Sequence, residues 1–404
     1  MKRVLRRLLL GLLGLAARPF VRRPSGAPTR IVYIKPDHLG DLLLATPALA
    51  ALRACFPNAQ IAALVGPWAA LVLARNPDLD ALLTCPFPGF ERMKRDTRQE
   101  TGDTRLQQLS RLLSPVSALV SLARPYLLLI RYALLLRAGR YDAALLGRDD
   151  HWWGAALALL AGIPVRVGFA TAECRPLLTR ALPWRPRDHV TSQGLALVGE
   201  LAGRAVGSFP ARFDPPPADH EWAAGWLREQ GIAAERLVVI HPGTAGPDKH
   251  WLPERWAEVA DGLCFDGAQM VLTGGPGEQA LVAQVAGAMR AEAAQLAGAT
   301  SLGQLAALLG QAQLVLGVDS GPLHLAAAQG RPTVHLYGPG DDARFGPWGS
   351  RARHMVVREE LWCSPCGVFS ACPRGLALPE CMERIAVARV LAEARGSLSI
   401  VRSA

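Results

Sequence analysis

Three short segments in the second half of the chain combine small residues with charged or hydroxylated ones, a composition typical of ligand-binding turns. In the central segment, Asp319-Ser320-Gly321 follows the apolar run 314–318 and precedes a helical pattern that carries His324. In a parallel sheet this turn lies at the carboxyl edge, where open α/β folds bind ligands. The N–H groups that begin the next helix suit a phosphate group. Asp319 could contact such a ligand or only cap the helix.

The other two segments carry groups suited to a diphosphate and a ribose. Residues 241–251 (HPGTAGPDKHW) provide the Thr244 hydroxyl as a donor and the Lys249 ammonium as a neutralising charge. Residues 273–278 (TGGPGE) end at Glu278, whose carboxylate could accept from ribose hydroxyls. Taken alone, each also fits a solvated loop or ordinary helix-dipole chemistry. Three such turns at one sheet edge predict a nucleotide-diphosphate site.

The first half has one comparable turn, residues 36–41 (PDHLGD). Asp41 is the candidate for a general base, because a carboxylate at a cleft-facing helix start could remove the proton of an acceptor hydroxyl. We expect the helix start to lower the pKa of Asp41, and a purely capping role is the alternative. His38 is a weaker candidate. Only Gly40 occupies the turn, so the glycine fingerprint of a dinucleotide-binding site is absent.

The elements that must position these turns alternate between strand and helix patterns in both halves of the chain. A proline-rich stretch at residues 208–219 (SFPARFDPPPAD) separates the halves and is typical of a linker. We therefore predict an α/β protein with two doubly wound, Rossmann-like domains that face each other across a cleft. The expected strands lie at residues 31–35, 59–65, 79–84, 141–146, 166–169, 237–240, 270–273, 295–297 and 314–318, and a further buried strand ends the segment 314–338. The expected helices include residues 42–56, 253–263 and 278–289 and one that Ser301 and Gln304 begin with a capping box.

The formal charge of +10 is concentrated in two leucine-rich segments. Residues 1–30 carry eight Lys or Arg and residues 105–140 carry six Arg, with no acid in either, so the remainder has a formal charge of −4. Cations beside apolar faces favour an anionic membrane surface over nucleic acid. The apolar run 8–17 is too short to span a bilayer and predicts an interfacial anchor helix, with a cleaved signal peptide as the alternative. Residues 112–136 are interrupted by charges and predict a surface-lying or core-inserted helical hairpin.

Four of the eight cysteines cluster near the carboxyl end. Tetrahedral zinc is one use of such a group, unligated thiols fit a reducing cytosol, and disulfides would fit a secreted chain. The other four are expected to be small buried hydrophobic residues. The clustered cysteines are Cys363, Cys366, Cys372 and Cys381, and the scattered ones are Cys55, Cys85, Cys174 and Cys264.

Several motifs taken together resemble the bacterial lipopolysaccharide heptosyltransferases, glycosyltransferase family nine, over residues 30–395. The matching stretches are IK at 34–35, GD at 40–41, TPAL at 46–49, DKHW at 248–251, and GVDSG at 317–321 with His324. The resemblance implies a GT-B fold and inverting transfer of a sugar from a nucleotide diphosphate, typically ADP-heptose, to a lipid-linked acceptor such as the lipopolysaccharide inner core. It implies an enzyme on the cytoplasmic surface of the inner membrane.

The resemblance also assigns roles to residues. Asp41 would be the catalytic base and Lys249 the diphosphate clamp. No metal or other cofactor is required in that family's scheme, because Lys249 and helix N-termini stabilise the leaving diphosphate. The acceptor-binding residues are not identified, and the insert at 105–140 is longer than the family leads us to expect. The remaining donor-binding candidates are Thr244, Glu278, Asp319, Ser320, Gly321 and His324.

With these roles, the domain prediction is complete. Residues 1–29 form the anchor, and residues 208–220 join an acceptor-binding domain, 30–207, to a nucleotide-sugar-binding domain, 221–355. Residues 356–404 form a cysteine-containing loop and a helix that packs back on the first domain. A nucleotide-sugar epimerase of the same fold and a non-catalytic, membrane-associated nucleotide-binding protein are the alternative functions.

Overall fold

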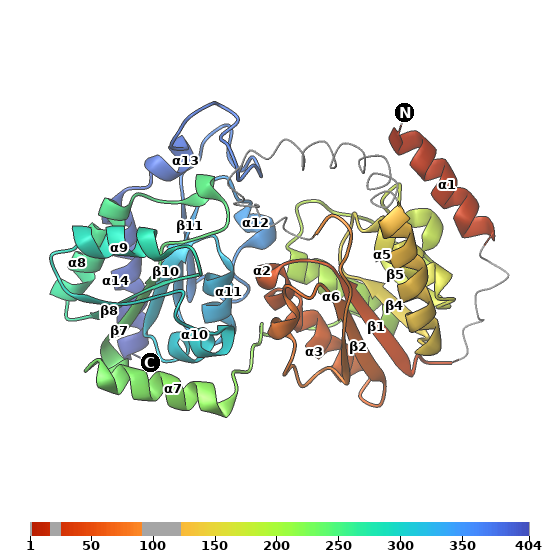
Figure 1. Ribbon diagram of the computed structural model, residues 1–404, viewed down its shortest axis with the longest axis horizontal. Coiled ribbons are helices and arrows are strands. Elements are labelled where there is room, and N and C mark those ends of the chain that lie inside the picture. Colours follow the sequence, from red (N-terminus) through yellow and green to blue (C-terminus); the bar gives the residue numbers. More distant parts are fainter. Residues whose placement is uncertain (1, 17–25, 91–122, 404) are drawn as a thin grey trace, which may run out of the picture.

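The computed structural model describes residues 2–16, 26–90 and 123–403, and in these ranges it contains two sheets of six parallel strands each. Helices cover both faces of each sheet, and the two sheets belong to two domains that lie side by side (Figure 1). Nearly continuous apolar strands are what a parallel sheet covered on both faces requires. The prediction of two doubly wound α/β domains is confirmed.

The first sheet has the strand order β3-β2-β1-β4-β5-β6. Alternate residues of β1 point to opposite faces, so Ile31 and Tyr33 enter one buried cluster and Val32 and Ile34 enter another. The strands are β1 (Arg30–Lys35), β2 (Gln60–Val65), β3 (Ala81–Thr84), β4 (Ala143–Leu146), β5 (Val165–Phe169) and β6 (Arg180–Leu182), and the helices are α1 (Lys2–Ala16), α2 (Leu39–Leu43), α3 (Thr46–Cys55), α5 (Trp152–Leu160) and α6 (Val190–Ala202), with 3₁₀ turns η2 (Ala70–Val72) and η3 (Arg175–Leu177) and a helix at residues 123–138.

The second sheet repeats this order as β12-β11-β10-β7-β8-β9. Its strands are β7 (Leu237–His241), β8 (Gln269–Gly274), β9 (Ala293–Ala297), β10 (Leu314–Val318), β11 (Thr333–Tyr337) and β12 (His354–Arg358). Its helices are α7 (Pro217–Glu229), α8 (Pro253–Phe265), α9 (Gln279–Ala288), α10 (Leu302–Leu309), α11 (Gly321–Ala328), α12 (Asp342–Phe345), α13 (Glu380–Glu383) and α14 (Val387–Ser403), with 3₁₀ turns η4 (Ala234–Arg236) and η5 (Pro247–Lys249). The capping box expected at Ser301 and Gln304 is confirmed.

The strand order places a topological switch point in each domain. β1 and β4 are neighbours in the first sheet, and β7 and β10 are neighbours in the second, although the chain leaves each pair toward opposite sides. Open α/β sheets bind ligands in the crevice at this point. The turns singled out in the sequence after residues 35, 241 and 318 all begin at these strand ends.

The two domains pack directly on each other. One buried cluster contains Leu42 and Leu49 from the first domain together with Leu323 and Ala326 from the second. Helix α2 of the first domain packs against α11 of the second. The Arg212 amide of the linker also donates to the Thr46 hydroxyl at 2.9 Å. The start of α2, which carries Asp41, is therefore held against the second domain.

Four expectations require correction. The helix expected at 42–56 is two helices, because the chain turns at Leu44 and Ala45 before the proline at the start of α3. β6 and β12 were not expected, and β12 runs across the boundary placed after residue 355. Helix α14 packs on α8 and on strands β10 to β12 of the second domain, not back on the first domain, because its apolar side fits the cluster beside β7.

Helix α1 has the amphipathic pattern expected of residues 8–17 and lies at the end of the first domain remote from the second (Figure 1). Residues 17–25 of the predicted leader and residues 105–122 of the predicted insert lie outside the described residues. In the described ranges, no helix is both long enough and apolar enough to cross a bilayer.

Candidate active site

The loop after β7 and the loop after β10 are joined by Lys249 and Asp319. The Lys249 ammonium lies 2.9 Å from Asp319 Oδ2 and donates to the Asp319 carbonyl oxygen at 3.2 Å. The Thr244 hydroxyl donates to the same carbonyl oxygen at 3.1 Å. The structure thus brings three of the predicted donor-binding residues together at the switch point of the second domain, beside the first turn of α11.

Two side chains at the start of α11 are buried without hydrogen-bond partners. Ser320 is the N-cap of α11, but its hydroxyl makes no capping bond and has no partner among the described residues. His324 Nδ1 is likewise buried and unpartnered, and burial lowers the pKa of His324 to about 4, which keeps the ring neutral. Buried polar groups are normally satisfied, so these two groups suit a bound polar ligand. Asp319 pairs with Lys249 and does not cap α11.

Glu278 lies against the loop after β7. Its carboxylate accepts from the Gly275 amide at 2.6 Å and lies 3.6 Å from His241 Nε2. A Cβ at position 243 would overlap this carboxylate, so Gly243 is what allows the close approach. Burial lowers the pKa of His241 to about 4 despite the nearby Glu278 charge. Glu278 therefore belongs to the same loop cluster as Thr244 and Lys249.

Asp41 lies at the boundary between the domains, in the first turn of α2. The adjoining Gly40 packs against α11, since a Cβ at that position would lie 3.2 Å from His324 Cδ2. Burial, with the Asp37 charge, raises the pKa of Asp41 to about 6, against the opposing effect of Lys35 and Arg148. The expectation that the helix start lowers this pKa was wrong, because desolvation and a neighbouring carboxylate outweigh the dipole of a five-residue helix.

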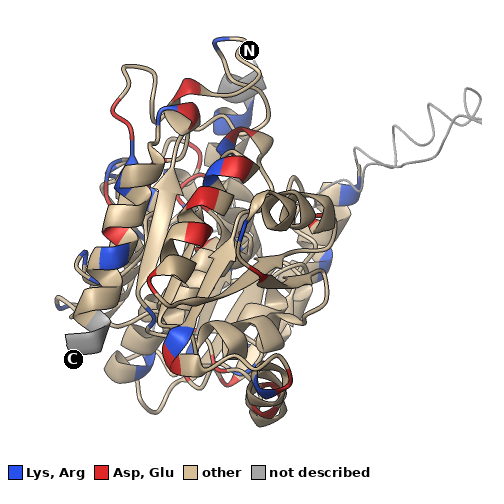
Figure 2. Ribbon diagram, turned by 90° about the vertical axis from the view of Figure 1, so that its left-hand side faces the viewer, with Lys and Arg blue, Asp and Glu red and all other residues tan. Residues whose placement is uncertain are grey.

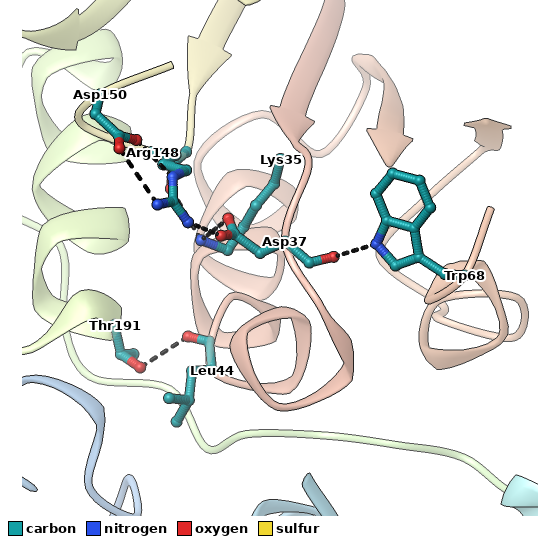
Figure 3. Close-up of polar contacts among 8 residues, drawn as sticks. Lys35, Asp37, Leu44, Trp68, Arg148, Asp150 and Thr191 are labelled. Atoms are coloured by element: carbon teal, nitrogen blue, oxygen red, sulfur yellow. Dashed lines mark hydrogen bonds and ion pairs between the residues drawn. The ribbon is translucent and has the colours of Figure 1, made fainter. Parts of the chain in front are cut away.

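A charged cluster beside Asp41 was not identified from the sequence. Asp37, in the turn that follows β1, forms ion pairs with Lys35, at 3.0 Å, and with Arg148, which follows β4 (Figure 3). Arg148 also pairs with Asp150, and Lys35 donates to the Gly147 carbonyl oxygen at 3.0 Å. Together, Lys35 and Arg148 hold the pKa of Asp37 below its usual value despite burial. The signal that could have found this cluster is the adjacency of β1 and β4 at the switch point.

Three hydrogen bonds fix the turn that carries Asp41. The Trp68 indole donates to the Asp37 carbonyl oxygen at 3.1 Å, and the Thr191 hydroxyl of α6 donates to the Leu44 carbonyl oxygen at 2.7 Å (Figure 3). The Thr46 hydroxyl donates to the Leu43 carbonyl oxygen at 2.7 Å. The α2 segment is therefore held from both ends, which limits where its carboxylate can lie.

The cysteine-containing loop also reaches the donor loop. The Phe369 ring lies 4.5 Å from the Lys249 ammonium in a cation–π contact. The four thiols expected in this loop line one small cavity with Asp248 and Arg374. No group of three or more His, Cys, Asp or Glu side chains among the described residues is arranged to hold a metal ion, and all eight cysteines are free thiols.

Two Rossmann-like domains that each contain a sheet of six parallel strands and pack on each other form a GT-B fold. A model of glycosyltransferase family 9 (heptosyltransferase) matches residues 130–372, and this chain belongs to that family. The chain is therefore a glycosyltransferase, as the motifs predicted.

Individual relatives agree with this assignment. Lipopolysaccharide heptosyltransferase 3 of Escherichia coli is 28% identical over 323 residues, which cover 77% of this chain and 84% of the relative. The crystal structure of a family 9 glycosyl transferase from Veillonella parvula DSM 2008 superposes with a TM-score of 0.72 at 22% identity, covering 94% of this chain and 100% of that one. E. coli ADP-heptose lps heptosyltransferase II gives a TM-score of 0.67 at 21% identity, covering 93% and 100%. At these identities the two structures bear on the fold alone.

Proposed function

We propose that this glycosyltransferase transfers heptose from ADP-heptose to a lipid-linked saccharide such as the lipopolysaccharide inner core, with inversion at the anomeric carbon and Asp41 as the general base. The observation that carries the proposal is the position of Asp41. It lies in the first domain but against α11 of the second, close enough to Asp319 that the Asp319 charge helps to raise its pKa. A base in this place faces the loops that suit a donor diphosphate.

In the proposed reaction, Asp41 accepts the proton of the acceptor hydroxyl as the oxygen attacks the anomeric carbon. The bond from that carbon to the diphosphate oxygen breaks, and ADP departs with the electron pair. A pKa of about 6 leaves Asp41 ionised at neutral pH and basic enough to share the proton in the transition state.

The second domain would stabilise the departing diphosphate. Lys249 supplies the charge, and the first turn of α11 supplies backbone N–H groups. Ser320 and His324 would then make the hydrogen bonds that they lack in this structure. Thr244 and Gly321 would contact phosphate and sugar. Glu278 would lie near the nucleoside. The N-terminal domain would bind the acceptor.

Heptose as the transferred sugar follows from membership of the heptosyltransferase family, and ADP as its carrier follows from the motif resemblance, which implies ADP-heptose. A lipid-linked acceptor would place the enzyme at the cytoplasmic surface of the inner membrane, as a peripheral protein. The first experiment is a thermal-shift measurement with ADP, UDP and GDP. Ligand at about a hundred times its dissociation constant stabilises the folded state by about 2.7 kcal/mol. We expect ADP alone to raise the melting temperature, and stabilisation by UDP or GDP instead would contradict the donor assignment.

A further inference from the structure

Two helices of the first domain expose an apolar side to solvent. α1 buries Leu10 and Gly14 against the domain, and the helix at residues 123–138 buries Leu129, Ala133 and Leu136. In an ordinary surface helix the side opposite the buried one is polar. In both of these helices that side is apolar instead. Their large hydrophobic side chains, each 44% to 65% exposed, are Leu8, Leu9, Leu12, Leu15, Tyr126, Leu127, Ile130, Leu134 and Leu135, here named the leucine face.

The exposed side chains form continuous stripes. Leu8, Leu12 and Leu15 follow helical spacing along α1, and Leu127, Ile130 and Leu134 do so along the second helix. The leucine face holds nine of the sixteen exposed large hydrophobic side chains in the part of the chain that the structure describes. Contiguous exposure of this kind marks an interaction site.

The two helices belong to one surface because both pack on the start of α5. The Arg6 guanidinium lies over the Trp152 ring at 5.6 Å, and the Trp153 indole donates to the Pro125 carbonyl oxygen at 3.2 Å. Leu10 of α1 and buried residues of the second helix share one core cluster. The leucine face therefore lies on the side of the first sheet that α5 covers.

The charge of the two helices indicates what covers this face. Their sequences contain seven Lys or Arg and no acid. Arg6 and Arg7 pair with Glu173 of the first domain, and Arg131 and Arg137 are exposed beside the apolar stripe. The second domain is different, since its helices carry acidic as well as basic residues (Figure 2). Leucines flanked by cations match an anionic lipid surface, where the apolar chains enter the headgroup boundary and the arginines contact phosphates.

We propose that the leucine face docks the enzyme on an anionic lipid bilayer through α1 and the helix at residues 123–138 together. This inference deepens the proposed function, on which it rests for its lipid-linked acceptor, and it assigns membrane contact to a surface built from two distant parts of the sequence. We expect both helices to be needed, because membrane binding scales with the apolar area buried and with the attraction of basic residues to anionic lipids, and each helix supplies only part of both.

The test is flotation of the full chain with vesicles of phosphatidylcholine, alone or with about 30% phosphatidylglycerol. We expect the chain to float with the anionic vesicles and to be released by high salt. L12E and L134E should each weaken binding about tenfold or more. F265E is the matched control, because Phe265 is 91% exposed on α8 of the second domain, and it should bind as the wild type does.

Three outcomes would overturn the proposal. The first is that the chain does not float with anionic vesicles, and the second is that L12E and L134E float as the wild type does. The third outcome is a wild-type dimer in solution that L12E alone makes monomeric, since the leucine face would then join two copies.

Transfer to an acceptor freed of its acyl chains separates this inference from the proposed function. If transfer persists in L12E while flotation is lost, the docking surface is supported. If no acceptor is glycosylated although flotation depends on Leu12 and Leu134, the proposed function fails and the docking surface stands.

Discussion

Lys249 and Asp319 form an ion pair of 2.9 Å between loops that are seventy residues apart in the sequence. The pair exists because β7 and β10 are neighbours in the sheet and both end at the switch point. It holds the ammonium beside the first turn of α11, so the cation is in position before a donor arrives. In the transition state the same ammonium would face the departing diphosphate, and preorganised charge of this kind needs no rearrangement during the reaction.

The first prediction concerns Lys249. K249M keeps most of the apolar stem and removes the charge, so we expect ADP to bind about 10- to 100-fold more weakly, as the loss of a charge-assisted hydrogen bond implies. Isothermal titration with ADP measures this change. R290M is the control, because Arg290 is exposed at the end of α9, away from the loops. Equal ADP affinity in K249M and R290M would contradict the diphosphate role.

The second prediction concerns the base. D41N retains the shape of the side chain and removes its basicity, so we expect turnover to fall by about 10²- to 10⁴-fold. ADP binding should change little, because the donor loops belong to the other domain. The control is D266N, at the end of α8, which should change neither turnover nor ADP binding. A D41N turnover within a few-fold of the wild type would mean that another group accepts the proton.

The third prediction is the pH dependence of kcat/KM. The pKa of Asp41 is raised to about 6 by burial and by Asp37, and the ionised form is the active one. The rate should therefore rise with pH to a plateau above about pH 6. D37N removes a negative neighbour while Lys35 and Arg148 remain, so the acid limb should move to lower pH. A limb that stays in place in D37N would show that Asp41 does not titrate there.

The sequence predicts much of this site because its turns follow buried apolar strands. Thr244, Lys249, Glu278 and Asp319 come together as expected, since parallel strands end at one edge of the sheet. The sequence did not indicate a role for Arg148, because its ion-pair partner Asp37 is 111 residues away. Their pairing depends on which strands are neighbours, which local patterns do not determine.

The same limit explains two other errors. From the sequence alone, the apolar side of α14 could pack on either domain. It packs on the second domain because its shape fits the apolar cluster beside β7. The pKa of Asp41 was expected to fall because the helix dipole is visible in the sequence. Burial between two domains and the approach of Asp37 are not visible there, and they reverse the direction.

The fourth prediction tests the packing at the end of β10. Gly317 is buried, and a Cβ there would overlap the His241 carbonyl oxygen of β7, which is backbone and cannot swing aside. G317A should lower the free energy of unfolding by about 1 to 3 kcal/mol. G225A is the matched control, because open space surrounds Gly225 in α7, and it should stabilise by about 0.5 to 1 kcal/mol. Equal melting temperatures for the two variants would contradict this packing.

The fifth prediction concerns stability at acid pH. Burial lowers the pKa of His241, His324 and His354 to about 4 and that of His335 still further. Between about pH 6.5 and pH 4 the unfolded chain binds protons that the folded chain does not, so the free energy of unfolding falls as pH falls. Each histidine with a pKa of about 4 costs on the order of 2 kcal/mol at pH 5.

Asp41 acts in the opposite direction, because its raised pKa makes the folded state bind a proton below about pH 6. Burial also raises the pKa of Asp78 and Asp149, and it lowers the pKa of His151 to about 4. The histidines outnumber the carboxyls that oppose them, so the melting temperature should decrease steadily from pH 7 to pH 5. Calorimetric scans at constant ionic strength measure this trend, and D41N should lose more stability on acidification than the wild type, since it lacks the compensating proton. A melting temperature that rises toward pH 5 would mean that these imidazoles become charged within the fold, which would contradict the buried, neutral His324 on which the donor site depends.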